Sequence, residues 1–158
     1  MSRQTRTVRE QIASIALVLV FLPLILPLVV VALVLFAMHR IVLNMLVWML
    51  WLPKGKDTLF VYSDSPIWHD YMTRQVLPLV HDRAIVLNWS ERSTWRKWRL
   101  TQQVFYTFAG HREFNPMVII FRPLRRPKLF RFWPAFKQWK KGHPDSVEQL
   151  RQELQMTL

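Results

Sequence analysis

The chain contains no cysteine, and this absence removes several classes of function. Disulfides, thiolate nucleophiles and thiolate metal sites all require cysteine, so none of them is available. Glycine is also scarce, with three residues in a chain of 158. Neither a P-loop nor a GxGxxG dinucleotide loop can be built from so few glycines. The sequence therefore excludes thiol chemistry and the two commonest glycine-rich phosphate-binding loops.

The familiar hydrolase motifs are absent as well. The sequence has no HExxH zinc motif and no GxSxG nucleophile elbow. Its five histidines are isolated, and no two stand at a spacing typical of metal ligands. We therefore expect no catalytic residue, no metal and no cofactor, and the chain is more readily interpreted as a binding protein than as an enzyme.

One long apolar run stands near the N-terminus. Residues 12–38 carry no charge, and as a helix they measure about 40 Å, against a hydrocarbon core of about 30 Å. A basic arm, residues 1–11, precedes the run, and no small-residue cleavage pattern follows it. The sequence predicts an uncleaved signal anchor with a single transmembrane helix. Pro23 and Pro27 leave open a re-entrant hairpin, and the second apolar stretch, 41–53, leaves open a pair of spans.

Residues 39–57, between the anchor and the first strand, are predicted to form a segment at the membrane interface followed by a linker. Arg40 ends the uncharged run, and Trp48 and Trp51 belong to the residue type enriched at membrane surfaces. We expect all three at the membrane interface. The numbers of basic residues before and after the anchor are nearly equal, so they do not decide its orientation. The strongly basic C-terminal domain favours a cytoplasmic position for that domain.

Residues 58–158 predict one basic α/β domain with the element order βαβαββα. Short apolar runs predict the strands and turn residues mark the helix starts. The last helix begins with a capping box from Ser146 to Gln149. The expected strands and helices are, in chain order, 58–62, 66–80 with Ser65 as N-cap, 84–88, a helix from Ser90 or Ser93 to 109, 117–121, 128–133 and 145–155. We expect two crossovers to give a parallel portion, which a hairpin then extends.

This order resembles the thioredoxin-like fold. The resemblance rests on the order of elements, on Pro116 just before the third strand, where that fold keeps a cis-proline, and on a helix after the hairpin. It implies a thioredoxin-like sheet over most of 58–156. The loop after the first strand has no CxxC, so a thiol-disulfide oxidoreductase is excluded and a redox-inactive binding module is implied. A small Rossmann- or flavodoxin-like sheet is the alternative fold.

Polar residues follow the first two expected strands. The carboxyl ends of parallel strands are where α/β sheets bind ligands, and helix N-termini there attract anions. The same residue types also serve as helix caps and turn residues without any ligand. The candidates for a small anion or nucleotide site are Ser63, Asp64, Ser65, Asn88, Ser90 and Glu91.

The strongest charge signal lies between residues 122 and 141. The formal net charge of the chain is +12, and this segment interleaves basic with aromatic residues and contains no acid. Such segments bind anionic lipid or, through stacking, nucleic acid. With an anchor in the same chain, the bilayer is the nearer polyanion, and nucleic acid is the less favoured partner. The candidate surface residues are Arg122, Arg125, Arg126, Lys128, Arg131, Lys137, Lys140 and Lys141.

These observations favour a membrane-anchored, non-catalytic module. Its basic aromatic surface would face anionic lipid headgroups or an acidic protein partner, and the protein would act as an accessory or scaffold subunit. The alternative is a membrane-tethered enzyme or nucleotide-binding domain that uses the polar strand ends.

Overall fold

The computed structural model describes residues 2–110, 116–143 and 145–158. The chain divides into two compact units, Met1–Ile41 and Val42–Leu158. We call the second unit the sheet domain. This division differs from the predicted boundary at residue 58, because the last turns of the N-terminal helix belong to the sheet domain.

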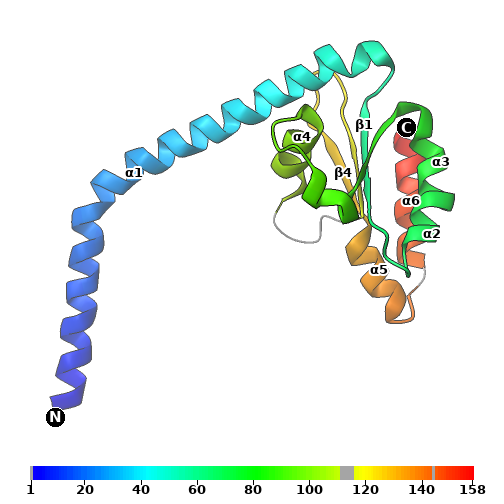
Figure 1. Cartoon of the computed structure of the whole chain (residues 1–158). Helices are drawn as coiled ribbons and strands as arrows, with labels where there is room; N and C mark the ends of the chain where they lie inside the picture. Colours follow the sequence, from blue (N-terminus) through cyan, green and yellow to red (C-terminus); the bar gives the residue numbers. More distant parts are fainter. Residues whose placement is uncertain (1, 111–115, 144) are drawn as a thin grey trace. The chain divides into compact units, whose positions relative to one another are not determined.

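The N-terminal element is one helix, α1 (Ser2–Leu50), which contains Pro23 and Pro27 (Figure 1). It is continuous, whereas a re-entrant hairpin or a pair of spans requires the chain to reverse. Both prolines are accommodated within the helix, as membrane helices commonly allow. The helix ends in a short 3-10 turn, η1 (Leu52–Lys54), which Gly55 closes in a left-handed conformation with φ 69°.

The sheet domain contains a four-stranded mixed sheet in the order β2-β1-β3-β4. β1 pairs in parallel with β2, and β3 is antiparallel to both β1 and β4. The expected α/β class and the hairpin are confirmed, but the expected parallel third strand is wrong. Met117 pairs with Val61 rather than with the start of β1, so β3 begins where β1 finishes. The strand bounds are β1 (Thr58–Tyr62), β2 (Ala84–Asn88), β3 (Met117–Ile120) and β4 (Lys128–Arg131).

Three consecutive segments form the helix between β1 and β2: α2 (His69–Tyr71), a π-helical stretch η2 (Met72–Val76) and α3 (Leu77–Val80). A 3-10 turn, η3 (His81–Arg83), follows. The π stretch ends just before Pro78, which has no N–H to donate, and the Leu77 N–H bonds to the Met72 carbonyl five residues back. The helix begins at His69 rather than at Pro66. Ser65 instead accepts the Trp68 and His69 N–H groups through its carbonyl, at 3.2 and 3.0 Å.

The long helix expected from Ser90 or Ser93 to Ala109 is divided. A 3-10 helix, η4 (Trp89–Thr94), comes first, and α4 (Leu100–Ala109) begins only after an intervening turn. Asn88, not a serine, caps η4, since its side chain accepts the Ser90 N–H at 3.0 Å. Trp95 is extended, and its ring packs edge-on against Trp89 and Phe105. This tertiary packing interrupts the helical periodicity that the sequence suggested.

The sequence also missed a helix. β4 ends at Arg131, and α5 (Phe132–Lys140) follows where a longer strand was predicted. Pro134 lies in the first turn of α5, where a missing N–H costs nothing. The last helix, α6 (Asp145–Thr157), is confirmed, but Ser146 lies within it and is therefore not its N-cap.

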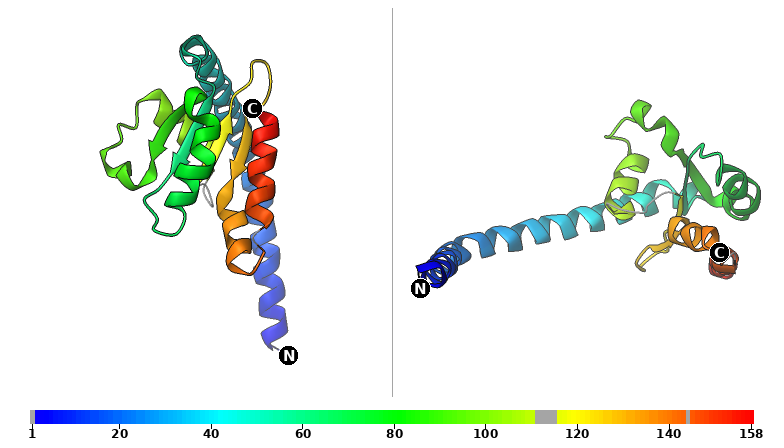
Figure 2. Two further views of the ribbon diagram at one scale, coloured as in Figure 1. Left: turned by 90° about the vertical axis from the view of Figure 1, so that its right-hand side faces the viewer. Right: turned by 90° about the horizontal axis from the view of Figure 1, so that it is seen from below.

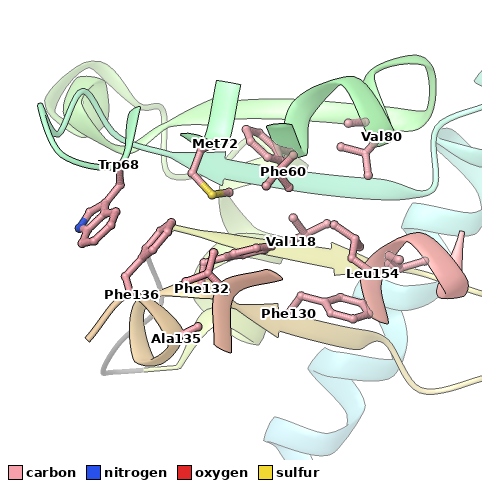
Figure 3. Packing of buried hydrophobic residues seen from close by; sticks show 14 residues of the cluster. Phe60, Trp68, Met72, Val80, Val118, Phe130, Phe132, Ala135, Phe136 and Leu154 are labelled. Atoms are coloured by element: carbon pink, nitrogen blue, oxygen red, sulfur yellow. The ribbon is translucent and has the colours of Figure 1, made fainter. Parts of the chain in front are cut away.

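One face of the sheet is covered by α2, η2, α3, α5 and α6 (Figures 1 and 2). Phe60, Val118 and Phe130 point from the strands toward these helices. Trp68 stacks on Phe136 with ring centroids 3.9 Å apart (Figure 3). The driving force for this layer is burial of large apolar side chains, worth about 1.5–3 kcal/mol each.

The opposite face is covered by α4 and by the C-terminal end of α1. Leu43, Val47 and Trp51 are buried in one cluster with strand residues and with α4. Trp51 is 5% exposed and meets Phe121 edge-to-face with ring centroids 5.9 Å apart. Trp51 therefore lies in the protein core rather than at the expected membrane interface, and Trp48 is half-buried against the same cluster. Residues 42–51 form a structural part of the sheet domain.

Candidate functional site

The predicted polar strand ends do come together. The Asn88 amide donates to both carboxylate oxygens of Asp64, at 3.1 Å each, and to Glu91 Oε1 at 3.2 Å. The Asp64 N–H donates to Ser90 Oγ at 2.9 Å. His69 Nδ1 lies 3.7 Å from Asp64, which gives an ion pair when the imidazole is protonated.

These polar groups largely satisfy one another. Asn88 uses its oxygen to cap η4 and its nitrogen to hold two acids, so the cluster ties the loop after β1 to the loop after β2. The neighbouring Tyr62 has a raised pKa, first because burial disfavours the phenolate and then because Asp64 and Glu91 repel it. Ser63 and Ser65 are half-buried in the same loop. The cluster has the character of a loop-positioning network.

The eight predicted basic residues do not form one surface. The Arg122 guanidinium donates to the Thr157 carbonyl near the end of α6. Lys128 Nζ lies 3.0 Å from both the Thr157 hydroxyl and Glu153. These two cations therefore bind the C-terminal turns of α6, where a helix favours positive charge. Arg131 is half-buried beside Gly110, whose φ of 80° ends α4.

Two clusters remain exposed, at opposite ends of β4. Arg125 and Arg126 lie in the turn between β3 and β4 (Figure 1). On α5, Lys137 lies over the Trp133 ring and Lys140 over the Trp68 ring, each at 5.6 Å from the centroid, and Lys141 follows. We call the turn 122–127 the basic turn.

The interleaved aromatic residues are mostly core residues. Phe130, Phe132 and Phe136 are fully buried (Figure 3). Trp133 is half-buried, and Trp139 is 39% exposed. The expected basic aromatic surface is therefore mainly basic, with Trp133 and Trp139 as its partly exposed rings.

The tip of the basic turn combines two unfavourable features. Leu124 is 91% exposed, and its φ is 58°. It is the one residue other than glycine with a positive φ in the ranges that the structure describes. A left-handed conformation costs a leucine about 1–2 kcal/mol, and an exposed leucine side chain gains nothing from burial. Fold stability therefore does not explain leucine at this position.

The sequence reading missed a pocket of about 280 Å³ beside the edge strand β2. Asn88 and Glu91, already candidates, line it together with Trp95, Arg96, Arg99 and Gln102. Arg96 and Arg99 border the pocket because the turn between η4 and α4, which the sequence does not indicate, brings them to β2. No group of three or more histidine and acidic side chains arranged to hold a metal occurs in the described ranges.

The apolar side chains described between Phe21 and Ile41 are exposed along the helix. As a helix, residues 21–41 measure about 31 Å, close to the bilayer core. The stretch Phe21–Lys54 belongs to the one described helix that is long and apolar enough to cross a membrane, judged by length and composition. A helix of this kind could serve as a membrane span or as a signal anchor.

No family model matches the chain, and no curated protein or solved structure is significantly similar to it.

Proposed function

We propose that this protein is a membrane-anchored, non-catalytic accessory or scaffold module whose basic turn lies against an anionic lipid surface. The residues that make this contact are Leu124, Arg125 and Arg126, with Lys54 at the same end of the sheet. The sequence predicted a binding surface over residues 122–141, and we now restrict it to the basic turn. An acidic protein that binds this turn is the alternative to the lipid surface.

Leu124 is the single observation that carries the proposal. Its conformation costs free energy that its exposed side chain does not recover by burial, and an observed outlier of this kind points to function. A leucine flanked by two arginines suits a bilayer interface, where the apolar side chain inserts and each cation gains about 1 kcal/mol from anionic headgroups.

The position of the turn within the sheet domain supports the same function. The Phe121 N–H donates to the Asp57 carbonyl at 2.8 Å, so the turn leaves β3 where the chain enters β1. Lys54, just after α1, is exposed at this end of the domain. The basic turn and the segment 54–57 therefore share one end of the sheet domain.

We also propose a redox-inactive, thioredoxin-like fold for the sheet domain. A parallel βαβ unit followed by a β-hairpin and C-terminal helices supports it, as does Pro116 directly before β3. The helix α5, between the hairpin and the last helix, departs from the expected pattern. Because the chain has no cysteine, a protein of this fold could not act as a thiol-disulfide oxidoreductase, and we propose a binding role instead.

The absence of cysteine makes the test direct, since one introduced thiol can be labelled alone. Full-length Leu124→Cys carrying an environment-sensitive fluorophore is reconstituted in nanodiscs of phosphatidylcholine, with or without phosphatidylglycerol. We expect a blue-shifted emission in the anionic discs only. A label at Trp98→Cys, which replaces a 71% exposed side chain after η4, provides the control and should stay in water in both discs.

A matched pair of charge reversals identifies the surface. Arg125→Glu with Arg126→Glu should abolish the blue shift, because it removes both flanking cations. Lys137→Glu with Lys141→Glu changes the net charge equally at the opposite end of β4 and should preserve it. Equal emission in both lipids, or equal loss with both pairs, rules out the lipid-facing turn.

The orientation requires a separate measurement. We propose a single span with the sheet domain on the cytoplasmic face, on the basis of its positive charge. In intact expressing cells, a membrane-impermeant maleimide should fail to label Trp98→Cys until the membrane is permeabilised. Labelling before permeabilisation would place the domain outside.

A further inference from the structure

The pocket beside β2 has a wall formed by three consecutive segments. β2 supplies Asn88, η4 supplies Glu91, and the start of α4 supplies Gln102. Its volume of about 280 Å³ is close to the lower end of the range for small-molecule sites. It lies on the α4 side of the loop-positioning network and shares only Asn88 and Glu91 with that network.

Gln102 is the feature that a simple surface hollow does not explain. It is 6% exposed, it lines the pocket, and its Oε1 has no hydrogen-bond partner among the residues that the structure describes. Leaving a buried amide oxygen unpaired costs about 1–3 kcal/mol. This oxygen is shielded from solvent, so a ligand in the pocket completes its hydrogen bonding when the Gln102 amide turns the oxygen toward the pocket.

The charges around Gln102 restrict the chemistry of that ligand. Arg96 and Arg99 both line the pocket, and the structure gives neither an ion-pair partner among the residues it describes. The first turn of α4 contains no acidic residue and no side-chain cap, so its N–H groups add to the positive end. Glu91 provides the single negative charge in the wall.

We propose that this pocket binds a small ligand of the amino-acid class, with acidic groups held by Arg96 and Arg99. The ligand's ammonium group lies toward Glu91 and the Gln102 carbonyl oxygen, which accept its protons. Its carbon chain rests on the Trp95 ring. Two cations and one anion in the wall match a ligand with two acidic groups and one amine.

The wall is positioned before any ligand arrives. Asn88 holds Glu91, and the Thr94 hydroxyl donates to the Glu91 carbonyl at 2.8 Å. The Arg99 N–H donates to the Arg96 carbonyl at 3.0 Å, which closes the turn that carries both arginines. A backbone held in this way loses little entropy when the site binds, while the exposed side chains of Arg96 and Arg99 become ordered on binding.

L-glutamate and glutarate make a matched pair of probes, because glutarate is glutamate without the amine. Saturation-transfer difference NMR on the full-length protein in detergent gives a dissociation constant for each. We expect glutamate to bind more tightly than glutarate. Arg96→Gln with Arg99→Gln should weaken glutamate binding about tenfold or more, since hydrogen bonds to charged groups are lost. Arg125→Glu with Arg126→Glu is the control and should leave it unchanged.

Gln102→Leu separates a ligand role from a packing role. Because leucine removes the unpaired oxygen, the variant should melt at the same or a higher temperature while binding glutamate more weakly. Unchanged binding in this variant would overturn the role given to Gln102. Equal affinity for glutarate would overturn the amine contact, and no saturation transfer to either probe would overturn the site. None of these outcomes depends on the behaviour of the basic turn.

Discussion

Replacing Trp51 by alanine tests whether the end of α1 is part of the sheet domain. Trp51 is almost fully buried, and its ring packs edge-to-face on Phe121 beneath the sheet. If residues 42–51 were instead a linker at a membrane surface, removing this ring would not affect how the domain unfolds. The variant therefore distinguishes a structural end of the anchor from a flexible tether.

The expected loss is large. Truncating a buried tryptophan to alanine costs about 3–5 kcal/mol, and this figure includes the contact with Phe121. For a unit of this size, such a loss lowers the melting temperature by roughly 10 °C or more. Met49 lies two residues away on the same helix and is 70% exposed, so Met49→Ala should change stability by no more than about 0.5 kcal/mol.

The assay is thermal unfolding of the full-length protein in a mild detergent. Near-ultraviolet circular dichroism follows the packed aromatic side chains, so the signal reports the sheet domain even while α1 stays helical. We expect the melting temperature of Trp51→Ala to lie well below that of the wild type, and the melting temperature of Met49→Ala to equal that of the wild type. If the two variants melt together, the end of α1 does not belong to the core.

Three further predictions concern stability, and unfolding of the full-length protein checks the first two. Arg83→Leu should lower the free energy of unfolding by about 2–3 kcal/mol, because it leaves the buried Asp57 carboxylate without its ion-pair partner. The loss is smaller than for a fully buried pair, since the Arg83 side chain is 39% exposed. Arg74→Leu, which breaks the exposed ion pair with Asp70, is the control and should change stability little. Leu124→Gly should leave stability unchanged or raise it by up to about 1 kcal/mol, since glycine accepts a positive φ; a clear loss would contradict the functional role given to this leucine. Burial raises the pKa of Tyr71, with Glu148 adding to the effect and Arg151 opposing it. Above about pH 10 the unfolded chain therefore loses the tyrosine proton while the folded state keeps it, and the free energy of unfolding should fall as the pH rises. Tyr71→Phe should reduce this fall, as measured by melting curves at alkaline pH.

Local patterns in the sequence were sufficient for the strands. β1 and β2 have the predicted bounds, because short apolar runs between turn residues specify buried strands. The helix after β2 and the start of α5 were mispredicted for one shared reason. Trp95 packs on Phe105 across the turn before α4, and Phe136 stacks on Trp68, which is distant in sequence; such packing overrides a pattern taken from neighbouring residues alone.

The candidate sites show the same limit. Asp64, Asn88 and Ser90 were placed together correctly, because the ends of parallel strands must meet. The exposure of Leu124 and the burial of Gln102 depend on backbone conformation and on side chains from other segments, which no local pattern contains. Charge alone also joined Lys128 to the exposed cations, although it is bound to α6.

The most direct test of the account is the depth of residue 124 relative to the bilayer. A spin label on Leu124→Cys in the full-length protein, in nanodiscs containing phosphatidylglycerol, is compared for collisions with oxygen and with a water-soluble nickel chelate. We predict that oxygen, which concentrates in lipid, is the more effective relaxing agent at this site, and that Arg125→Glu with Arg126→Glu reverses the preference. A label that meets the nickel chelate as freely as one at Trp98→Cys would contradict the proposal that the basic turn lies on the membrane.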